Sequence, residues 1–394
     1  MTIFGHSLLG QSRLSKRIST HTLKSALMFF NKDLLALLVF SCALLFTACG
    51  EDDETTVELK DTPELVNLRA AQLADANTYG ITPAAEALTI STRALAEQLS
   101  NFLGNPTEQE VINLQDAWGA TSTASVKFEM YDIPKSRFTT RLLNRSTSAD
   151  EVLEDLANPD VVFDDAFFVR GNLMPVLEYL IFNDEPAVVI TQIQADTRRQ
   201  EFLVAAKDYL ASQADLYTTQ WDELRDEAIS NTTLSPLGGQ NRLANRLISS
   251  MRYTYAGRLN APINEGMDNG EFVPYAFEAF YSKKSLDLLQ ASWQEWTRLF
   301  YRDFGSSDGS IGFDYYLIAL VEQQLLQNID DAVADINTKI NQLTSIQGDL
   351  VNNPALLEEA FTAYGEMQRF IILDMAQAMC ILIEYSGCDG GDCD

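Results

Sequence analysis

The chain of 394 residues contains two histidines, His6 and His21, and none after them. Histidine is the commonest ligand of catalytic zinc and the usual base beside a serine or cysteine nucleophile. Beyond residue 21 the chain therefore supplies neither a histidine-ligated zinc site nor a Ser–His or Cys–His pair. This argues against a zinc peptidase and against the common nucleophilic hydrolases.

Other patterns are also missing. No segment shows a convincing alternation of apolar and polar residues, and no glycine-rich phosphate loop follows a strand. Basic side chains are scarce, because 28 Lys and Arg stand against 56 Asp and Glu. Such an acidic surface repels nucleic acid and attracts cations or basic partners, so no nucleic-acid partner is expected. Plain solubility is the competing explanation for the charge.

The N-terminal segment has the pattern of a targeting signal. Residues 34–48 (LLALLVFSCALLFTA) form a short apolar run behind Lys32, and small residues precede Cys49. This length is typical of a secretory signal rather than a membrane-spanning helix. The pattern resembles a bacterial lipoprotein signal, whose cysteine is lipidated. We predict a signal over 1–48, with Met28 as an alternative start; a plainly cleaved signal is the competing interpretation.

Loss of this signal would make the chain more acidic. Residues 1–48 carry five basic and one acidic side chain, so 23 basic and 55 acidic side chains remain, with a formal charge of −32. The acidic, non-periodic start of the remainder predicts a solvated tether over 49–62. An aspartate directly after the lipidated cysteine usually marks a lipoprotein for retention in the inner membrane, and this chain has Gly50 at that position. We therefore expect an envelope protein, anchored to the outer membrane by lipid and facing the periplasm or the surface.

Three cysteines lie near the C-terminus. Cys380 is expected within an apolar helix, as a small core residue. Cys388 and Cys393 flank Asp-Gly-Gly-Asp in the acidic tail 388–394, where an oxidising compartment favours a local disulfide. Two cysteines without a nearby histidine do not predict a zinc site.

The periodic segments have helical spacing. One face runs from Val111 through Trp118 to Phe128, and a second runs over seven turns from Ile318 to Leu343. Trp118 at this spacing is expected in the core. The last long helix is predicted over about 361–384. The fold class predicted is all-α, with long helices and short connections in two packed helical bundles.

The clearest break in this pattern is polar and contains proline and paired glycines (NTTLSPLGGQ, 231–240). We place a domain boundary there, with an N-terminal bundle over 63–230 and a C-terminal bundle over 241–387.

Several segments, in order, resemble the imelysin-like family of bacterial envelope proteins. They are LQDAWGATSTASVKFEMYDI (114–133), VLEYLIF (176–182), RLANRLISSMRYTYAGRLNAP (242–262), FEAFYSKKSLDLL (277–289) and CDGGDCD (388–394). Each motif is weak alone, but together they span nearly the whole chain after the signal. The resemblance implies two pseudo-symmetric four-helix bundles with a site between them, and a role often associated with iron uptake.

The family's founding member is catalogued as a metallopeptidase, with a metal motif glycine-x-histidine-x-x-glutamate. Aligned on Glu178, this motif has Leu173 and Pro175 in place of the glycine and the histidine, so only the glutamate matches. A metallopeptidase is therefore not expected. The resemblance instead favours a non-enzymatic binding or accessory lipoprotein in metal uptake, iron above all. The alternative is a structural or protein-interaction lipoprotein whose metal site has decayed.

Glu178 lies in a strongly apolar segment, where an ionised carboxylate needs a partner. Arg170, eight residues earlier, is the expected countercharge in a purely structural interpretation. In the functional interpretation, Glu178 faces a cleft together with Glu278, Tyr281 and Ser282. Such an all-oxygen cluster suits a hard cation, ferric iron included. Pro175 is expected at the start of the helix, where its missing N–H needs no partner.

Overall fold

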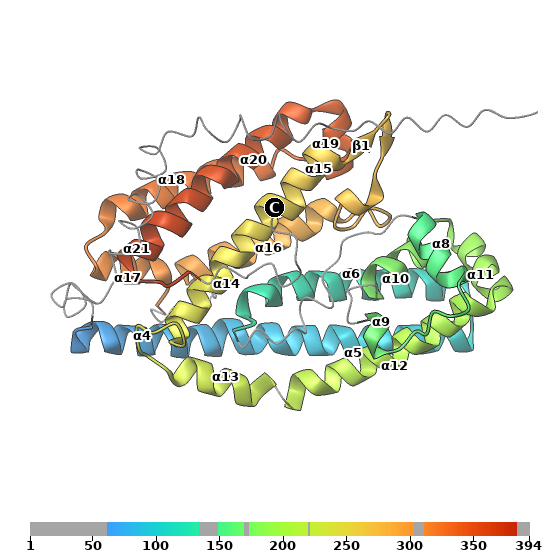
Figure 1. Ribbon diagram of the computed structural model, residues 1–394, viewed down its shortest axis with the longest axis horizontal. Helices are drawn as coiled ribbons and strands as arrows, with labels where there is room; N and C mark the ends of the chain where they lie inside the picture. The colour runs from blue at the N-terminus through green and yellow to red at the C-terminus, as the bar shows by residue number, and fades with distance from the viewer. Residues whose placement is uncertain (1–60, 134–148, 169–172, 220, 303–310, 384–394) are drawn as a thin grey trace, which may run out of the picture. The chain divides into compact units, whose positions relative to one another are not determined.

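One long helical rod runs from Pro63 to Gly104 (Figure 1). It consists of α4 (Pro63–Asp75), a π-helical segment (Ala76–Ile81) and α5 (Thr82–Gly104). The Thr62 side chain caps its start by accepting a hydrogen bond from the Leu65 N–H, and Pro63 occupies the first turn. The rod contacts helices from both halves of the chain, because α4 packs against α13, α14 and α17 while α5 packs against α6 and α12.

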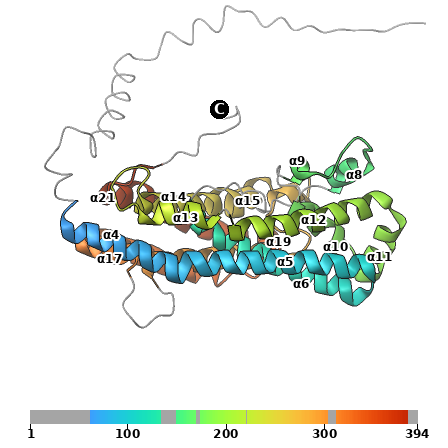
Figure 2. The same cartoon turned by 90° about the horizontal axis from the view of Figure 1, so that it is seen from below.

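The other elements of the first half follow the rod. They are α6 (Glu108–Phe128), a 3-10 turn (Glu129–Tyr131), α8 (Ala149–Ala157), α9 (Asp165–Phe167), α10 (Leu173–Phe182), α11 (Pro186–Ala195), α12 (Thr197–Thr219) and α13 (Trp221–Ser230). Figure 2 shows α5, α6 and α12 running alongside one another. Trp118 of α6 is fully buried, as its helical spacing predicts, and its indole N–H donates to the Met174 carbonyl of α10 (3.1 Å).

The second half begins with a helix that is also interrupted by a π-helical segment. Its elements are α14 (Gly239–Tyr253), the π-helical segment Thr254–Asn260, α15 (Ala261–Glu265), β1 (Met267–Asp268), β2 (Glu271–Phe272), a 3-10 turn (Pro274–Ala276), α16 (Ser285–Tyr301), α17 (Phe313–Ala319), α18 (Gln323–Ile340), α19 (Ile346–Asn352), α20 (Pro354–Arg369), a third π-helical segment (Phe370–Met375) and α21 (Ala376–Ala378).

A small antiparallel hairpin, formed by β1 and β2, is the single sheet in the ranges that the structure describes. Its turn residues Asn269 and Gly270 both have positive φ, as a type I′ hairpin turn requires. The alternation is too short to register as a strand pattern in the sequence.

The computed structural model describes residues 61–133, 149–168, 173–219, 221–302 and 311–383. Within these ranges the chain is all-α apart from the hairpin, which confirms the predicted fold class. No helix in these ranges is both long and apolar enough to cross a membrane. The predicted signal, the tether up to residue 60, Cys49, Arg170, Cys388 and Cys393 lie outside the described residues.

A stack of aromatic rings follows one face of α16 in the core. Trp293 stacks on Trp296 and Trp296 on Phe300, with ring centroids 5.3 and 5.1 Å apart. The indole N–H of Trp293 donates to Asn337 Oδ1 (2.7 Å) and that of Trp296 donates to the Leu247 carbonyl (3.2 Å). Both polar groups of these buried rings are therefore satisfied.

Two predicted helices have different bounds in the structure. The face expected from Ile318 to Leu343 is broken at Val321, whose φ of 64° is left-handed, and Ile318 and Val321 are exposed. The continuous buried face starts at Leu325 in α18. The helix expected over 361–384 starts at Pro354 and ends by Ala378, so Cys380 lies after the helix, with a φ of 54°.

The predicted domain boundary coincides with the connection between α13 and α14. Asn231 begins this connection, and its carbonyl accepts a hydrogen bond from the Gly239 N–H (2.7 Å). The contacts group residues 55–394 into one compact unit. The division into an N-terminal and a C-terminal bundle stays a prediction.

Candidate functional site

Glu178 is buried in α10. Nine of the ten residues of this helix are buried, which makes it one of the most enclosed elements of the chain. The Glu178 side chain has no exposed surface. Pro175 lies in the first turn of α10, as predicted, where a missing N–H has no cost. A carboxylate in this position requires hydrogen-bond donors from a neighbouring element.

Ser282 supplies two of these donors. Its backbone N–H and its hydroxyl both donate to Glu178 Oε1, at 2.9 and 2.7 Å. These bonds join α10 to the segment 277–284, more than a hundred residues later in the chain. The structure therefore brings together two of the residues that the sequence singled out.

The segment 277–284 is held rigidly. Ser285 Oγ, at the start of α16, accepts the Ala279 N–H (3.3 Å) and donates to the Ala279 carbonyl (3.1 Å). Gln347 of α19 donates to the Phe280 carbonyl (3.2 Å). Lys283 has a φ of 60°, which turns the chain into α16. Ser282 is thus presented to Glu178 by a fixed loop.

Tyr281 lies beside the Glu178–Ser282 contact. Its ring meets the ring of Tyr179, the residue after Glu178, edge to face with centroids 5.1 Å apart. It also packs edge to face on Phe280. The predicted neighbours Glu178, Tyr281 and Ser282 therefore belong to one local cluster.

Glu278 has a different partner. Its two carboxylate oxygens accept hydrogen bonds from the Arg258 guanidinium, at 2.6 Å from Nε and 3.0 Å from Nη2. Both side chains are almost completely buried. The predicted cluster of four oxygen ligands is thus divided, because the Glu278 carboxylate is engaged by a buried cation.

Arg258 is the centre of a second buried network. It lies in the π-helical segment 254–260 and donates further to Thr254 Oγ1 (3.1 Å), Ser292 Oγ (3.0 Å) and Glu129 Oε2 (3.3 Å). Its guanidinium also lies 4.6 Å from the centroid of the Tyr253 ring. π-helical turns are frequent at functional sites.

The charges in this network perturb one another. Burial alone would lower the pKa of Arg258, but the Glu278 and Glu129 carboxylates raise that pKa above its usual value. Burial raises the pKa of Glu129; the Arg258 guanidinium opposes this effect, and the Glu278 carboxylate adds to it. Two carboxylates therefore share one buried cation. Arg258 and Glu129 lie within two of the segments that resemble the family, but neither was predicted as a site residue.

Further buried contacts cross between the two predicted bundles. The Tyr131 hydroxyl donates to Glu295 Oε1 (2.6 Å), and Arg298 bonds both Glu295 (2.8 Å) and the Tyr79 carbonyl (2.7 Å). Burial and the neighbouring Glu295 raise the pKa of Tyr131 well above its ordinary value. Together with Ser282–Glu178 and Arg258–Glu129, these bonds fix the first half of the chain to the second.

The side chains around Glu178 do not fit the metal of the family's motif. Leu173 and Pro175, which replace the motif's glycine and histidine, are buried apolar residues without a donor atom. Glu278 is bonded to Arg258, and Glu178 Oε1 already accepts two hydrogen bonds. In the described part of the chain, no three His, Cys, Asp or Glu side chains are grouped so that they could hold a metal.

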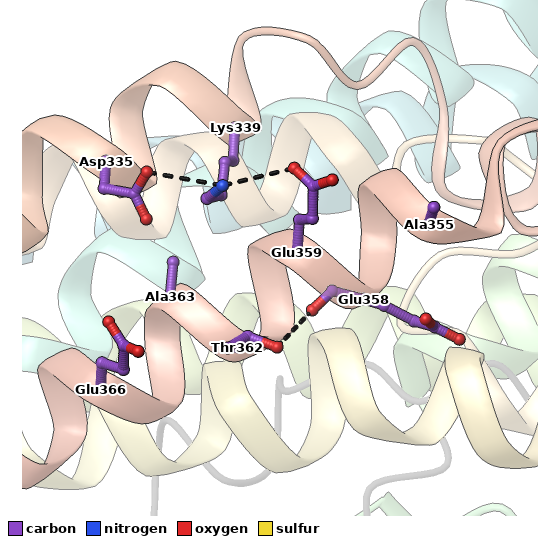
Figure 3. A pocket seen from close by; sticks show the side chains of 8 residues that line it. All are labelled: Asp335, Lys339, Ala355, Glu358, Glu359, Thr362, Ala363 and Glu366. Atoms are coloured by element: carbon purple, nitrogen blue, oxygen red, sulfur yellow. Dashed lines mark hydrogen bonds and ion pairs between the residues drawn. The ribbon is translucent and has the colours of Figure 1, made fainter.

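An acidic groove of about 450 Å³ lies between α18 and α20 (Figure 3). Lys339 Nζ lies within it, 3.5 Å from Asp335 and 3.3 Å from Glu359. These carboxylates help to raise the pKa of Lys339 above its ordinary value, against the lowering effect of its partial desolvation. Figure 3 shows Glu358 and Glu366 directed away from the lysine, so the acids of the groove do not converge on one point.

Comparison with known proteins agrees with the resemblance seen in the sequence. The profile of the imelysin family matches residues 81–367. No functionally curated protein is significantly similar in sequence. An imelysin-like protein from Psychrobacter arcticum 273-4 has a similar structure, with a TM-score of 0.61 and 14% identity, over 81% of this chain and 98% of that chain.

A second solved structure is also similar. It is described as an iron-regulated protein A precursor from Parabacteroides distasonis ATCC 8503, and it matches with a TM-score of 0.58 and 15% identity over 79% of this chain and 95% of that chain. Both likenesses establish the fold. Since the family profile also covers most of the sequence, this chain belongs to the imelysin family.

Proposed function

We propose that this chain is a non-enzymatic envelope lipoprotein that serves iron uptake as an accessory, partner-binding component. The observation that carries the proposal is the environment of Glu178. Its carboxylate is enclosed by α10 and hydrogen-bonded by Ser282, while Pro175 stands at the position of the motif histidine. A zinc peptidase needs a metal with an open position for water, and these side chains do not provide one.

The proposed role in iron uptake is supported by the similarity of this chain to known proteins, and not by the geometry around Glu178. The chain is an imelysin, and one protein of the same fold is described as iron-regulated. The pattern around Cys49 supports lipid anchoring. The high negative charge disfavours binding to nucleic acid, which agrees with a role in the envelope. In this proposal the glutamate at the position of the family's metal motif joins α10 to the loop 277–284 and so holds the two halves of the chain together.

The test is iron accumulation in cells that lack the protein. With limiting iron, deletion should lower radioactive iron uptake, and the wild-type chain should restore it. Glu178→Gln should also restore it, because the carboxylate is not required as a metal ligand here. Cys49→Ala should restore it poorly, because the variant is not held at the membrane. Unchanged iron uptake after deletion would refute the proposal.

A peptidase assay addresses the chemistry directly. The purified protein should cleave peptides no faster than a buffer blank, with or without a chelator, and Glu178→Gln should behave in the same way. Chelator-sensitive cleavage by the wild type that is lost in Glu178→Gln would restore the metallopeptidase interpretation.

A second candidate function, binding of a hard cation such as ferric iron, has one supporting observation. The Glu178 carboxylate, the Ser282 hydroxyl and Tyr281 lie in one cluster, and oxygen ligands suit such ions. Titration of the purified protein with ferric and ferrous iron tests it. Stoichiometric binding that is lost in both Glu178→Gln and Ser282→Ala, and kept in the exposed control Ser212→Ala, would favour this candidate.

A further inference from the structure

Three segments that are far apart in the sequence meet around the buried guanidinium of Arg69. Its Nε donates to the Thr232 carbonyl (2.9 Å), its Nη1 donates to the Tyr316 hydroxyl (3.0 Å), and its Nη2 pairs with Asp61. Arg69 has no exposed surface. The start of α4, the connection between α13 and α14, and α17 therefore form one end of the bundle.

The last described residues are fixed at the same end. Leu382 donates its N–H to Asn241 Oδ1 (2.7 Å), and its carbonyl accepts from Asn245 Nδ2 (2.9 Å). Asn241 also donates to the Pro236 carbonyl (3.2 Å). Figures 1 and 2 both place the start of α4, α17 and α21 together at this end, opposite α8 and α11.

Large apolar side chains are exposed on these elements. Their exposed fractions run from 43% to 73%, and they are Leu237, Tyr315, Ile318, Val321 and Leu382. We call these five residues the tether-end surface. Tyr315 and Ile318 lie one turn apart on α17, and Val321, with a left-handed backbone, follows directly after this helix.

One aromatic–cation pair belongs to this surface. The Arg302 guanidinium lies 5.3 Å from the centroid of the Tyr315 ring. Tyrosine and arginine each combine an apolar body with a polar end, and both are suited to the boundary between lipid headgroups and hydrocarbon. The pair thus has the chemistry of a membrane-interface contact.

The short distance along the chain from Cys49 to Asp61 indicates which partner lies against this surface. Asp61, paired with Arg69, follows Cys49 by twelve residues, and a chain of that length spans at most about 40 Å. If Cys49 carries lipid, the tether leaves the bundle at the end where these apolar side chains are exposed. Such tethering raises the local concentration of a bilayer around weakly binding side chains.

We infer that the tether-end surface rests on the phospholipid bilayer, with its apolar side chains in the headgroup region and the Tyr315–Arg302 pair at the water boundary. The inference rests on the proposed lipid anchor at Cys49. Because the chain is strongly acidic, apolar contact and the tether hold it there, and attraction to anionic lipid does not. Contact should therefore persist in high salt.

Fluorescent labels at two single cysteines test the orientation. The protein is the lipidated full-length chain with Cys380, Cys388 and Cys393 changed to serine, in vesicles of phosphatidylethanolamine and phosphatidylglycerol that contain nitroxide lipid. One label is attached through Val321→Cys. The matched control is Val162→Cys, a valine of similar exposure between α8 and α9. We expect a loss of emission at residue 321 and none at residue 162, in low and high salt alike.

Membrane fractionation of the Cys49→Ala variant distinguishes failure of the proposed lipid anchor from failure of the proposed bilayer contact. If this variant remains as membrane-bound as the wild type, the lipid anchor is wrong. If Cys49→Ala is released but the label at residue 321 in the lipidated chain is quenched no more than the label at residue 162, the anchor stands and the inference fails.

Charge insertion provides a second measurement. Ile318→Glu with Val321→Glu should increase protease cleavage of the membrane-bound chain near residues 233–237, because the surface is lifted from the bilayer. Val162→Glu with Val188→Glu, at the other end, should not. Equal cleavage in both pairs would also overturn the inference.

Discussion

Ser282 places both its backbone N–H and its hydroxyl on a single oxygen of Glu178, so one residue supplies two of the hydrogen bonds that a fully buried carboxylate needs. The contact links a helix of the first half of the chain to a loop of the second. It occupies the position at which other members of the family are expected to hold a metal ligand.

Ser282→Ala should lower the free energy of unfolding by about 1–3 kcal/mol, because the variant removes one donor from a buried carboxylate and leaves the other. Urea unfolding followed by circular dichroism measures this. Ser212→Ala is the control, since the Ser212 hydroxyl is exposed and bonds its own helix at the Tyr209 carbonyl. Equal stability of the two variants would show that the Ser282 hydroxyl is not important for Glu178.

Arg258→Met should destabilise the protein by about 3–5 kcal/mol, because it leaves the buried carboxylate of Glu278 without its cation. Arg93→Met is the matched control, since Arg93 pairs with Asp215 on the surface, where such a pair contributes about 0–1 kcal/mol. Adding Glu278→Leu to Arg258→Met should recover part of the loss. A double variant that loses the sum of both single effects would contradict the assignment of these residues as a pair.

Stability should depend on the protonation of Glu129. Its pKa is raised in the folded protein, so between its ordinary pKa and the raised value the folded state binds more protons than the unfolded state. Its contribution to stability is therefore present at low pH and lost as the pH rises through this interval. Glu129→Gln should flatten this part of the curve of unfolding free energy against pH. The same slope in the wild type and the variant would rule out Glu129 as the group concerned.

Limited proteolysis should cut first in the tether before residue 61 or within residues 231–240. The tip of the 231–240 connection is exposed at Thr233, Pro236 and Leu237. The two fragments should nevertheless elute together, because Gln240 bonds Gln72 and Arg258 bonds Glu129 across the cut. Fragments that separate without denaturant would mean that the two predicted bundles are independent domains.

The helices and much of the core could be predicted from the sequence because they depend on local spacing. Trp118 repeats at the period of a helix and is buried, and Glu178 is conspicuous because it is charged in an apolar segment. Ser282 was found through the resemblance to a family, since nothing local connects it to Glu178.

The Arg258 network could not be predicted in this way. Glu129 and Arg258 lie 129 residues apart along the chain, so no local pattern connects them. Glu278 was predicted as a site residue, but its pairing with Arg258 was not.

The break at Val321 was missed for another reason. Apolar residues continue at helical spacing through it, but the left-handed Val321 closes α17 with two capping hydrogen bonds, from the Val321 N–H to the Ile318 carbonyl and from the Glu322 N–H to the Leu317 carbonyl. A β-branched residue rarely adopts this conformation, so its identity did not signal the cap. The span that contains Arg170 lies outside the described residues, so its pairing with Glu178 stays a prediction.

The π-helical segments have a consequence for how the length of this chain can vary. An extra residue in a regular α-helix would rotate everything after it by about 100°, which would carry the buried faces of that helix into solvent. A π turn absorbs one extra residue locally, so the helices before and after Ala76–Ile81 can keep their separate neighbours. Related proteins can therefore differ by a single residue at Ala76–Ile81, Thr254–Asn260 or Phe370–Met375 and still align their cores on both sides.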